Sequence, residues 1–158
     1  MPSSLTPPFF DSSKKLLLVV EDSEEDYEVF LRSVKKSDVD CYIFRCETGE
    51  EAWDFLNNEK VSDGLPLPVL PSMILLDLNL PGMDGQTILS KIKSDPKLKL
   101  IPVIIFSTSS SSKDIQSCYE NGANAYVVKP MDILKIRDHI NILLKHWLEV
   151  NVYDSNFL

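Results

Sequence analysis

Residues 73–85 read MILLDLNLPGMDG, and this stretch decides the fold class. Its first four residues are continuously apolar, which is typical of a strand buried on both faces of a parallel sheet. Asp77 follows directly, and Pro81-Gly82 begins a turn ahead of a helical apolar pattern over residues 88–92. The stretch therefore predicts a buried strand, a loop that opens with a carboxylate, and a helix.

The same alternation of a short apolar run and an amphipathic segment recurs on both sides of this stretch. Ser23 and Thr48 are expected to cap the first two helices, and the last helix is expected to span about 132–148. Five strands alternating with five helices predict the α/β class, as a doubly wound, five-stranded parallel sheet. The four other predicted strands are 16–20, 41–44, 103–106 and 125–128.

Polar side chains follow four of the five predicted strands, at the point where each strand ends. Glu21 and Asp22 follow the first strand, Asp77 the third, Ser107 the fourth and Lys129 the fifth. In an open parallel sheet the ligand crevice lies outside the carboxyl ends of the strands. We therefore expect these five side chains to converge at one edge of the sheet.

Three carboxylates brought together repel one another, and their removal from water adds to the cost. Either some of them are protonated, or a hard divalent cation lies among them, and Mg²⁺ suits such an all-oxygen set. Lys129 could pair with Asp77 or hold a phosphoryl oxygen, and Ser107 supplies a hydroxyl donor. An aspartate with these neighbours is arranged to attack phosphorus and form an aspartyl phosphate.

The region from Lys15 to about Leu148 resembles the receiver domains of two-component response regulators. The resemblance implies the flavodoxin-like receiver fold and a phosphorelay switch that a histidine kinase phosphorylates, rather than a turnover enzyme. It rests on the acid pair Glu21-Asp22, the LLDLNLPGMDG segment around Asp77, Ser107 after the fourth strand and the pair Lys129-Pro130, all in the family's order.

The resemblance also assigns roles within the site. Asp77 would be the phosphoacceptor, and Lys129 would bridge to the phosphoryl group. Mg²⁺ would be held by Glu21, Asp22, Asp77 and the backbone carbonyl of Asn79, with Asp22 the more direct ligand of the acid pair.

A second group of residues would carry the switch. Ser107 would turn inward on phosphorylation, Tyr126 would move with it, and Lys129-Pro130 is expected to be a cis bond. Two positions depart from the commonest family pattern without changing the chemistry, because Glu21 replaces an aspartate and Ser107 replaces a threonine.

Within the family, the chain is most similar to the small cyanobacterial phytochrome response regulators. The similarity lies in the proline-containing loop before the third strand, the LLDLNLPG sequence around Asp77, the IPVIIFSTS segment and Trp147-Leu148-Glu149. It implies a phytochrome histidine kinase as phosphodonor and a homodimer as a common state.

The apolar residues of the last helix favour the same oligomeric state. One helical stripe is expected to face the core, and Ile142, Leu144 and Leu148 fall off it. Together with apolar residues of the C-terminal tail, they predict a patch for a homodimer formed through the C-terminal helices. The core stripe consists of Ile133, Ile136, Ile140, Leu143 and Trp147.

Composition narrows the possible partners and compartment. A formal net charge of −8 argues against direct binding to nucleic acid, and no apolar run is long enough to cross a membrane. The opening MPSSLTPPFF lacks a secretory signal, and three cysteines without metal-ligand spacing indicate a reduced, cytoplasmic protein. We expect an N-terminal tail (1–14), one receiver domain (15–149) and a C-terminal tail (150–158), with no output domain.

Three other functions compete with the receiver interpretation. A haloacid-dehalogenase-like phosphatase needs a second aspartate two residues after the nucleophile, where this chain has Asn79. A flavodoxin-like FMN site needs a Ser/Thr-rich loop after the first strand, where this chain has Glu21-Asp22-Ser23. A receiver that binds partners without phosphorylation stays open, and phosphorylation chemistry is the observation that would distinguish it.

Overall fold

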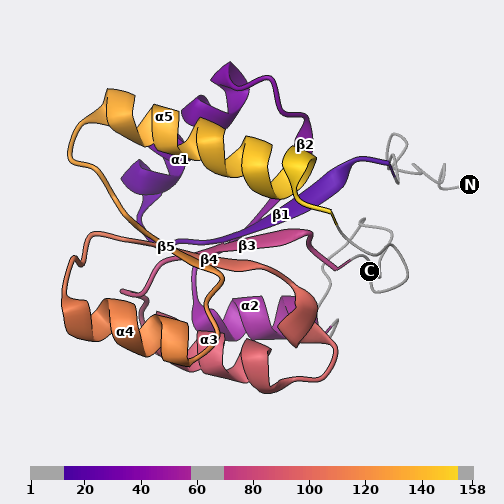
Figure 1. The fold of residues 1–158 in the computed structure, drawn as a ribbon, viewed down its shortest axis with the longest axis vertical. Helices are drawn as coiled ribbons and strands as arrows, with labels where there is room; N and C mark the ends of the chain where they lie inside the picture. The colour runs from indigo at the N-terminus through magenta and orange to yellow at the C-terminus, as the bar shows by residue number, and fades with distance from the viewer. Residues whose placement is uncertain (1–12, 58–69, 153–158) are drawn as a thin grey trace, which may run out of the picture.

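The computed structural model describes residues 13–57 and 70–152, and its centre is one sheet between two layers of helices (Figure 1). Five parallel strands lie in the order β2-β1-β3-β4-β5, which is the doubly wound arrangement that the sequence predicted. The strands are β1 (Lys15–Val20), β2 (Cys41–Cys46), β3 (Met73–Leu76), β4 (Val103–Ser107) and β5 (Ala125–Val128). The helices are α1 (Glu24–Lys36), α2 (Gly49–Leu56), α3 (Gly85–Ser94), α4 (Ser112–Glu120) and α5 (Ile133–Leu144), with a 3₁₀ turn η1 (Leu98–Leu100) and a π-helix η2 (Lys145–Val150).

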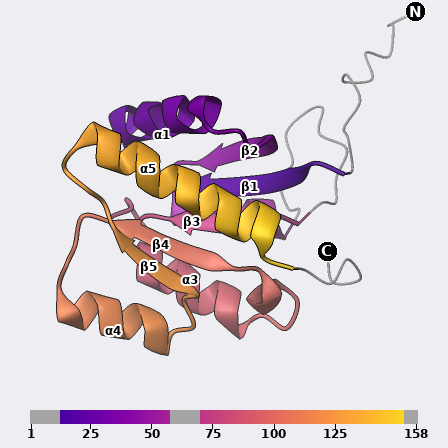
Figure 2. The same cartoon turned by 45° about the horizontal axis from the view of Figure 1, so that its top comes forward.

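The two faces of the sheet carry separate hydrophobic clusters. Figure 1 shows α1 and α5 on one face and α2, α3 and α4 on the other, and Figure 2 shows the same two layers from another side. Because side chains alternate along a strand, Leu17 and Val19 of β1 pack with the α1 and α5 side, whereas Leu18 and Val20 pack with the other. This two-sided burial explains why β1, β3 and β4 are continuous apolar runs in the sequence.

The register of the strands determines where the polar residues after them lie. Val20 of β1 pairs with Leu76 of β3, so Glu21 and Asp77 leave the sheet side by side. Ser107, the last residue of β4, pairs with Val128 of β5, and the Lys129 N–H donates to the Ser107 carbonyl at 2.7 Å. The carboxyl ends of β1, β3, β4 and β5 therefore bring these residues to one edge.

The predicted helix starts are confirmed at α1 and α2. Ser23 Oγ accepts a hydrogen bond from the Asp26 N–H at 3.2 Å, and Thr48 Oγ1 accepts one from the Glu51 N–H at 3.1 Å. These caps satisfy backbone donors that the first turn of a helix leaves without a partner. Local sequence alone was enough to identify them.

The last helix differs from its prediction. The α-helix ends at Leu144 and continues as a π-helix, in which the Asn151 N–H donates to the His146 carbonyl at 2.7 Å. Leu144, the last residue of α5, and Leu148, within η2, are both buried, so the prediction that they form an exposed patch was wrong. Ile133, expected in the core, is 59% exposed because it lies in the first turn of α5, beyond the end of β5.

The Lys129–Pro130 bond was expected to be cis, and it is trans. Trans is the intrinsically preferred form of an X–Pro bond, by about 0.5–1 kcal/mol. The Lys129 ammonium reaches the carboxyl ends of β1 and β3 with this bond trans, since its backbone is already fixed by the hydrogen bond to Ser107.

Three predicted segments fall wholly or largely outside the described residues. They are the N-terminal tail (1–14), the loop between Asn57 and Ser72, and the C-terminal tail (150–158). Across the described part of the chain, none of the helices combines the length and the apolar character that crossing a membrane requires.

Gly85, the first residue of α3, lies close against the backbone of Asp77 and Leu78, and this close approach can be tested by mutation. A Cβ at Gly85 would lie 2.3 Å from the Asp77 carbonyl oxygen and 2.6 Å from Leu78 Cα, both backbone atoms that have little room to move. We expect Gly85→Ala to lower the free energy of unfolding by about 1–3 kcal/mol, as overpacking does elsewhere. Urea denaturation measures this, and the matched control Ser90→Ala, at an exposed position of the same helix, should change stability by less than about 0.5 kcal/mol. Equal stability of the two variants would contradict the prediction.

Candidate functional site

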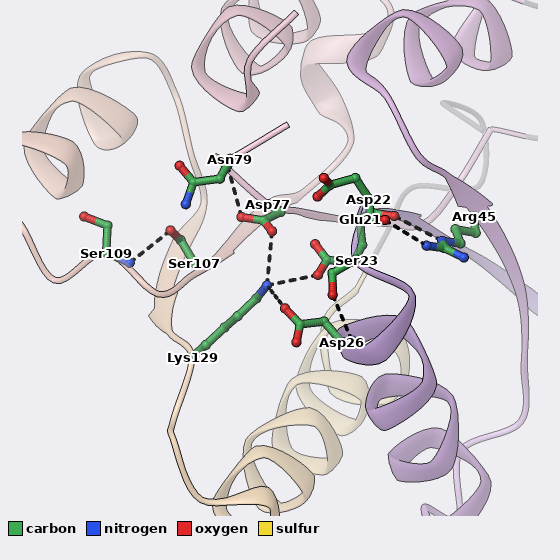
Figure 3. Close-up of polar contacts among 10 residues, drawn as sticks. All are labelled: Glu21, Asp22, Ser23, Asp26, Arg45, Asp77, Asn79, Ser107, Ser109 and Lys129. Carbon is green, nitrogen blue, oxygen red and sulfur yellow. Dashed lines mark hydrogen bonds and ion pairs between the residues drawn. The ribbon is translucent and has the colours of Figure 1, made fainter. Parts of the chain in front are cut away.

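Asp77 lies at the centre of the predicted cluster, directly after β3. Its backbone N–H donates to the Val20 carbonyl at 3.1 Å, which extends the β1–β3 pairing to the first residue of the loop. The residue is only 8% exposed. Its two carboxylate oxygens have different partners, since Oδ1 accepts from the Asn79 N–H at 3.2 Å and Oδ2 accepts from Lys129 Nζ at 3.1 Å (Figure 3).

Lys129 donates to three carboxylates at once. Its ammonium lies 3.1 Å from Asp77 Oδ2, 3.2 Å from Glu21 Oε1 and 3.0 Å from Asp26 Oδ2, and the side chain is 9% exposed. Burial acts to lower the pKa of Lys129, but the charges of Asp77 and Glu21 and the contact with Asp26 outweigh it and raise that pKa above its ordinary value. Lys129 is therefore a permanent cation in this site.

Asp26 was missed as a member of this cluster. The sequence suggested only a first-turn residue of α1, where carboxylates favour the helix dipole. The structure shows a second role, because its carboxylate points across the site to Lys129 (Figure 3). Burial raises the pKa of Asp26, yet hydrogen bonds with Glu21 and Lys129 outweigh it and leave that pKa below its ordinary value. Asp26 and Lys129 are 103 residues apart in the sequence, so no local pattern could have revealed this contact.

Glu21 is the most strongly perturbed acid of the site. Burial raises its pKa first, and a hydrogen bond to Asp77 in its protonated form raises it further, to about 9, although Lys129 acts in the opposite direction. As an ionised group, Glu21 has one buried oxygen, Oε2, without a hydrogen-bond partner. A buried carboxylate oxygen without a partner is costly, so either a proton or a cation would stabilise it.

The geometry fits a divalent cation among the acidic side chains. One carboxylate oxygen each from Glu21, Asp22 and Asp77 lies within 4.8 Å of the others, and Asp22 is exposed where water ligands would enter. An all-oxygen set suits Mg²⁺, which keeps several waters, and the unpartnered Oε2 of Glu21 is an oxygen that a cation could stabilise. The residues present therefore fit a metal; the part assigned to the Asn79 carbonyl stays a prediction.

The wall behind the site is apolar. Phe30, Leu75 and Phe106 line the same small cavity as the charged groups, and Lys129 Nζ lies 5.7 Å from the centroid of the Phe106 ring. Apolar walls lower the local dielectric, so charge interactions inside the site are stronger than they would be at the surface.

Ser107 and Tyr126 meet at a third residue that the sequence did not indicate. Ser107 is fully buried, and its Oγ accepts from the Ser109 N–H at 3.2 Å. The Tyr126 hydroxyl donates to the Ser109 carbonyl at 2.8 Å, and Ser109 Oγ donates to Asp114 of α4 at 2.6 Å. Ser109 therefore joins both predicted switch residues to α4.

Of the five residues predicted to converge, Lys129 contacts both Glu21 and Asp77, whose carboxylate oxygens lie within 4.8 Å of each other. Asp22 lies beside them within the acidic group, and Ser107 lies at the adjoining strand end with its hydroxyl engaged by Ser109. The structure therefore confirms that these five residues lie at the same edge of the sheet.

Comparison with known proteins agrees with this geometry. Residues 17–141 match the model of the response regulator receiver domain family. The chain belongs to this family. Five strands, five helices and a carboxylate at the end of β3 are thus the receiver fold, as the sequence resemblance implied.

Among its relatives, this receiver domain is 34% identical over 135 residues to the response regulator Rcp1 of Synechocystis, covering 85% of this chain and 90% of that protein. It is 32% identical over 136 residues to the probable methanogenesis regulatory protein FilR2 of Methanothrix harundinacea, covering 86% and 85% of the two chains.

Solved structures give the same picture. The phosphorylated cyanobacterial phytochrome response regulator RcpA superposes with a TM-score of 0.81 at 32% identity, covering 90% of this chain and 99% of that one. The Mn²⁺-bound form of Rcp1 superposes with a TM-score of 0.80 at 33% identity, covering 89% and 99%. The receiver domain is therefore related to the cyanobacterial phytochrome response regulators.

The raised pKa of Glu21 predicts how stability depends on pH. Between about 4.5 and 9 the folded protein holds a proton on Glu21 that the unfolded chain has released, so this group makes folding less favourable as pH rises through that window. In the presence of a chelator, Glu21→Gln should remove that loss and stabilise the fold at pH 8.5 by about 1 kcal/mol, with little effect at pH 4.5. Urea midpoints at the two pH values measure this. A variant that is less stable than wild type at pH 8.5 would refute the prediction.

Proposed function

We propose that this receiver domain accepts a phosphoryl group on Asp77 from a histidine kinase, in a reaction that requires Mg²⁺. The observation that carries the proposal is the arrangement around Asp77. A buried carboxylate lies beside a permanent cation, with the acidic oxygens of Glu21 and Asp22 in a group that fits a divalent metal. Both functions of such a site, attack on phosphorus and stabilisation of phosphoryl charge, have a residue present.

The proposed step transfers one phosphoryl group from a phosphohistidine to Asp77. A carboxylate oxygen of Asp77 forms a bond to the phosphorus of a phosphohistidine, the P–N bond breaks, and its electron pair remains on the imidazole nitrogen, which then takes up a proton. Lys129 donates to a phosphoryl oxygen as charge develops on it, and a bound Mg²⁺ would neutralise further charge there. Ser107 supplies a hydroxyl donor from the end of β4.

The same residues would convert phosphorylation into a change of shape. The Ser107 hydroxyl, which would donate to a phosphoryl oxygen, accepts from the Ser109 N–H, and the Ser109 carbonyl accepts from the Tyr126 hydroxyl. A rearrangement at Ser107 is therefore coupled to Tyr126 and α4. In this proposal the protein is a switch that gains and loses one phosphoryl group, not a turnover enzyme.

The nature of the phosphodonor is proposed from the relatives. Structures named as phytochrome response regulators superpose over about nine-tenths of the chain, which supports a phytochrome-type histidine kinase as partner. The free thiols of Cys41, Cys46 and Cys118 are typical of a protein in a reducing compartment, which we propose to be the cytoplasm.

The phosphoacceptor can be tested by intact-protein mass spectrometry with a small phosphodonor. Wild type should gain one phosphoryl group in the presence of Mg²⁺ and none with a chelator, and Asp77→Asn should gain none, because an amide oxygen is not a competent nucleophile. Asp38→Asn, at an exposed position before β2, is the matched control and should be phosphorylated like wild type. No gain in wild type would instead favour a receiver that binds partners without phosphorylation.

We also propose a homodimer that forms through the α5 face. Ile142 is 64% exposed near the end of α5, and Leu134, about two turns earlier, is 63% exposed. Of the residues that the sequence suggested for an apolar surface, Ile142 is exposed, whereas Leu144 and Leu148 are buried. Apolar side chains grouped on one helix are typical of a surface that another protein covers.

Sedimentation velocity tests the dimer. We expect wild type to sediment as a dimer at high micromolar concentration and Ile142→Glu to shift by at least about tenfold towards monomer, since a charge buried in an apolar interface is costly. Ser90→Glu, which adds the same charge on α3, is the control. A monomeric wild type, with and without a phosphoryl group, would eliminate the proposal.

A further inference from the structure

Arg45, the fifth residue of β2, reaches across to the loop that carries the acid pair. Its Nε donates to the backbone carbonyl of Glu21 at 3.0 Å, and its Nη2 donates to the backbone carbonyl of Asp22 at 3.4 Å (Figure 3). Both carbonyls lie beyond Val20, the last residue of β1. The arginine therefore holds the backbone at the point where the strand ends and the acidic residues begin.

The guanidinium group is itself fixed on every side. Nη1 lies 2.6 Å from Glu24 Oε2, Nη2 lies 3.3 Å from Glu47 Oε1, and the Tyr27 ring stacks with its centroid 4.4 Å from Cζ. The side chain is only 14% exposed. Because a guanidinium is planar with donors in a rigid fork, it can bind two carbonyls and two carboxylates at once, which the single ammonium of lysine cannot reproduce.

A role in stabilising α1 alone does not explain this placement. Cations are unfavourable near the N-terminus of a helix, and Arg45 lies beside Glu24, the first residue of α1. The hydrogen bonds instead converge on the loop between β1 and α1. The neighbouring Cys46 adds a backbone tie, since its carbonyl accepts from the Glu21 N–H at 3.0 Å. The end of β2 thus holds the backbone of the acid pair through hydrogen bonds with both Arg45 and Cys46.

We propose that Arg45 is a positioning residue for the metal site. By fixing the backbone carbonyls of Glu21 and Asp22, it holds their carboxylates in the orientation that faces Asp77. This inference rests on the proposed function, because it concerns how the same acidic group binds Mg²⁺. Arg45 contacts neither the metal position nor the phosphoryl group in this scheme; it acts through the loop.

Electrostatics and positioning predict opposite effects for the loss of Arg45. Removal of a positive charge near an acidic site should strengthen cation binding through Coulomb attraction. Loss of positioning should weaken it, since groups that orient metal ligands typically contribute about 10–100-fold to metal affinity. The sign of the change therefore distinguishes the two.

The first experiment is calorimetric titration of the full chain with Mg²⁺. We expect Arg45→Met and Arg45→Lys both to weaken Mg²⁺ binding by about tenfold, although the lysine variant keeps the charge. Arg32→Met is the matched control, because it removes the same charge from a side chain on α1 that is 75% exposed, and its affinity should stay within about twofold of wild type. Circular dichroism confirms that each variant is folded, and Arg45→Lys serves if Arg45→Met is not.

A second readout separates positioning from a general loss of structure. With a small phosphodonor, the Mg²⁺ concentration for half-maximal phosphorylation should rise about tenfold in Arg45→Lys, whereas the maximal rate at saturating Mg²⁺ should stay within about twofold. A saturating Mg²⁺ concentration restores the phosphorylation rate of a site whose metal ligands are only misoriented. It does not restore the rate of a site that has lost its structure. An equal fall of both quantities would overturn the inference.

Hydrogen exchange gives an answer that does not need metal. In the presence of a chelator, the Glu21 N–H should exchange about fivefold to tenfold faster in Arg45→Met than in wild type, as expected when hydrogen bonds to a charged group are lost. Unchanged exchange, together with Mg²⁺ binding as tight as in wild type, would refute the role of Arg45. If wild type itself binds no Mg²⁺, the proposed function fails, and hydrogen exchange alone decides whether Arg45 fixes this loop.

Discussion

The ammonium of Lys129 lies within 3.2 Å of oxygens from Glu21, Asp26 and Asp77, and the site depends on this one cation. Without it, buried carboxylates on adjoining strand ends would repel one another in an apolar cavity that weakens their hydration. With it, the acids are held together, and the pKa of Glu21, raised to about 9, means that the metal-free site also holds a proton there. A divalent metal would take the place of that proton among the oxygens of Glu21, Asp22 and Asp77, which lie close enough together to share one cation.

Glu21 shows the cost of this arrangement most clearly. A buried oxygen without a hydrogen-bond partner and a pKa raised to about 9 mark a group whose environment does not suit its ionised form. Protein cores normally avoid such groups, and their presence at a functional edge is typical of a site shaped for a ligand rather than for stability. The sheet tolerates Glu21 because the continuous apolar strands beneath it supply the stability that the site lacks.

The site is connected to the rest of the molecule by side chains that bind backbone. Arg45 ties β2 to the acidic loop, and Ser109 ties Ser107 and Tyr126 to α4. In the proposed switch, phosphorylation at Asp77 acts through Ser107 and Ser109 on the α4 side of the domain. The acidic loop on the other side of Asp77 is held against β2 by Arg45.

The sequence by itself determined the strands, the helix caps at Ser23 and Thr48, and the sheet edge where Glu21, Asp77, Ser107 and Lys129 meet. Those features follow from local patterns and from the rule that parallel strands place their carboxyl ends together. Only the tertiary structure decided the partners of each side chain. Asp26, Arg45 and Ser109 come from segments whose local patterns indicate a helix turn, an edge strand and a loop, and long-range contacts alone give them their roles. The Lys129–Pro130 bond keeps the trans form that an X–Pro bond prefers locally, whereas the π-helical end of α5 is a feature of the tertiary structure that no local pattern indicated.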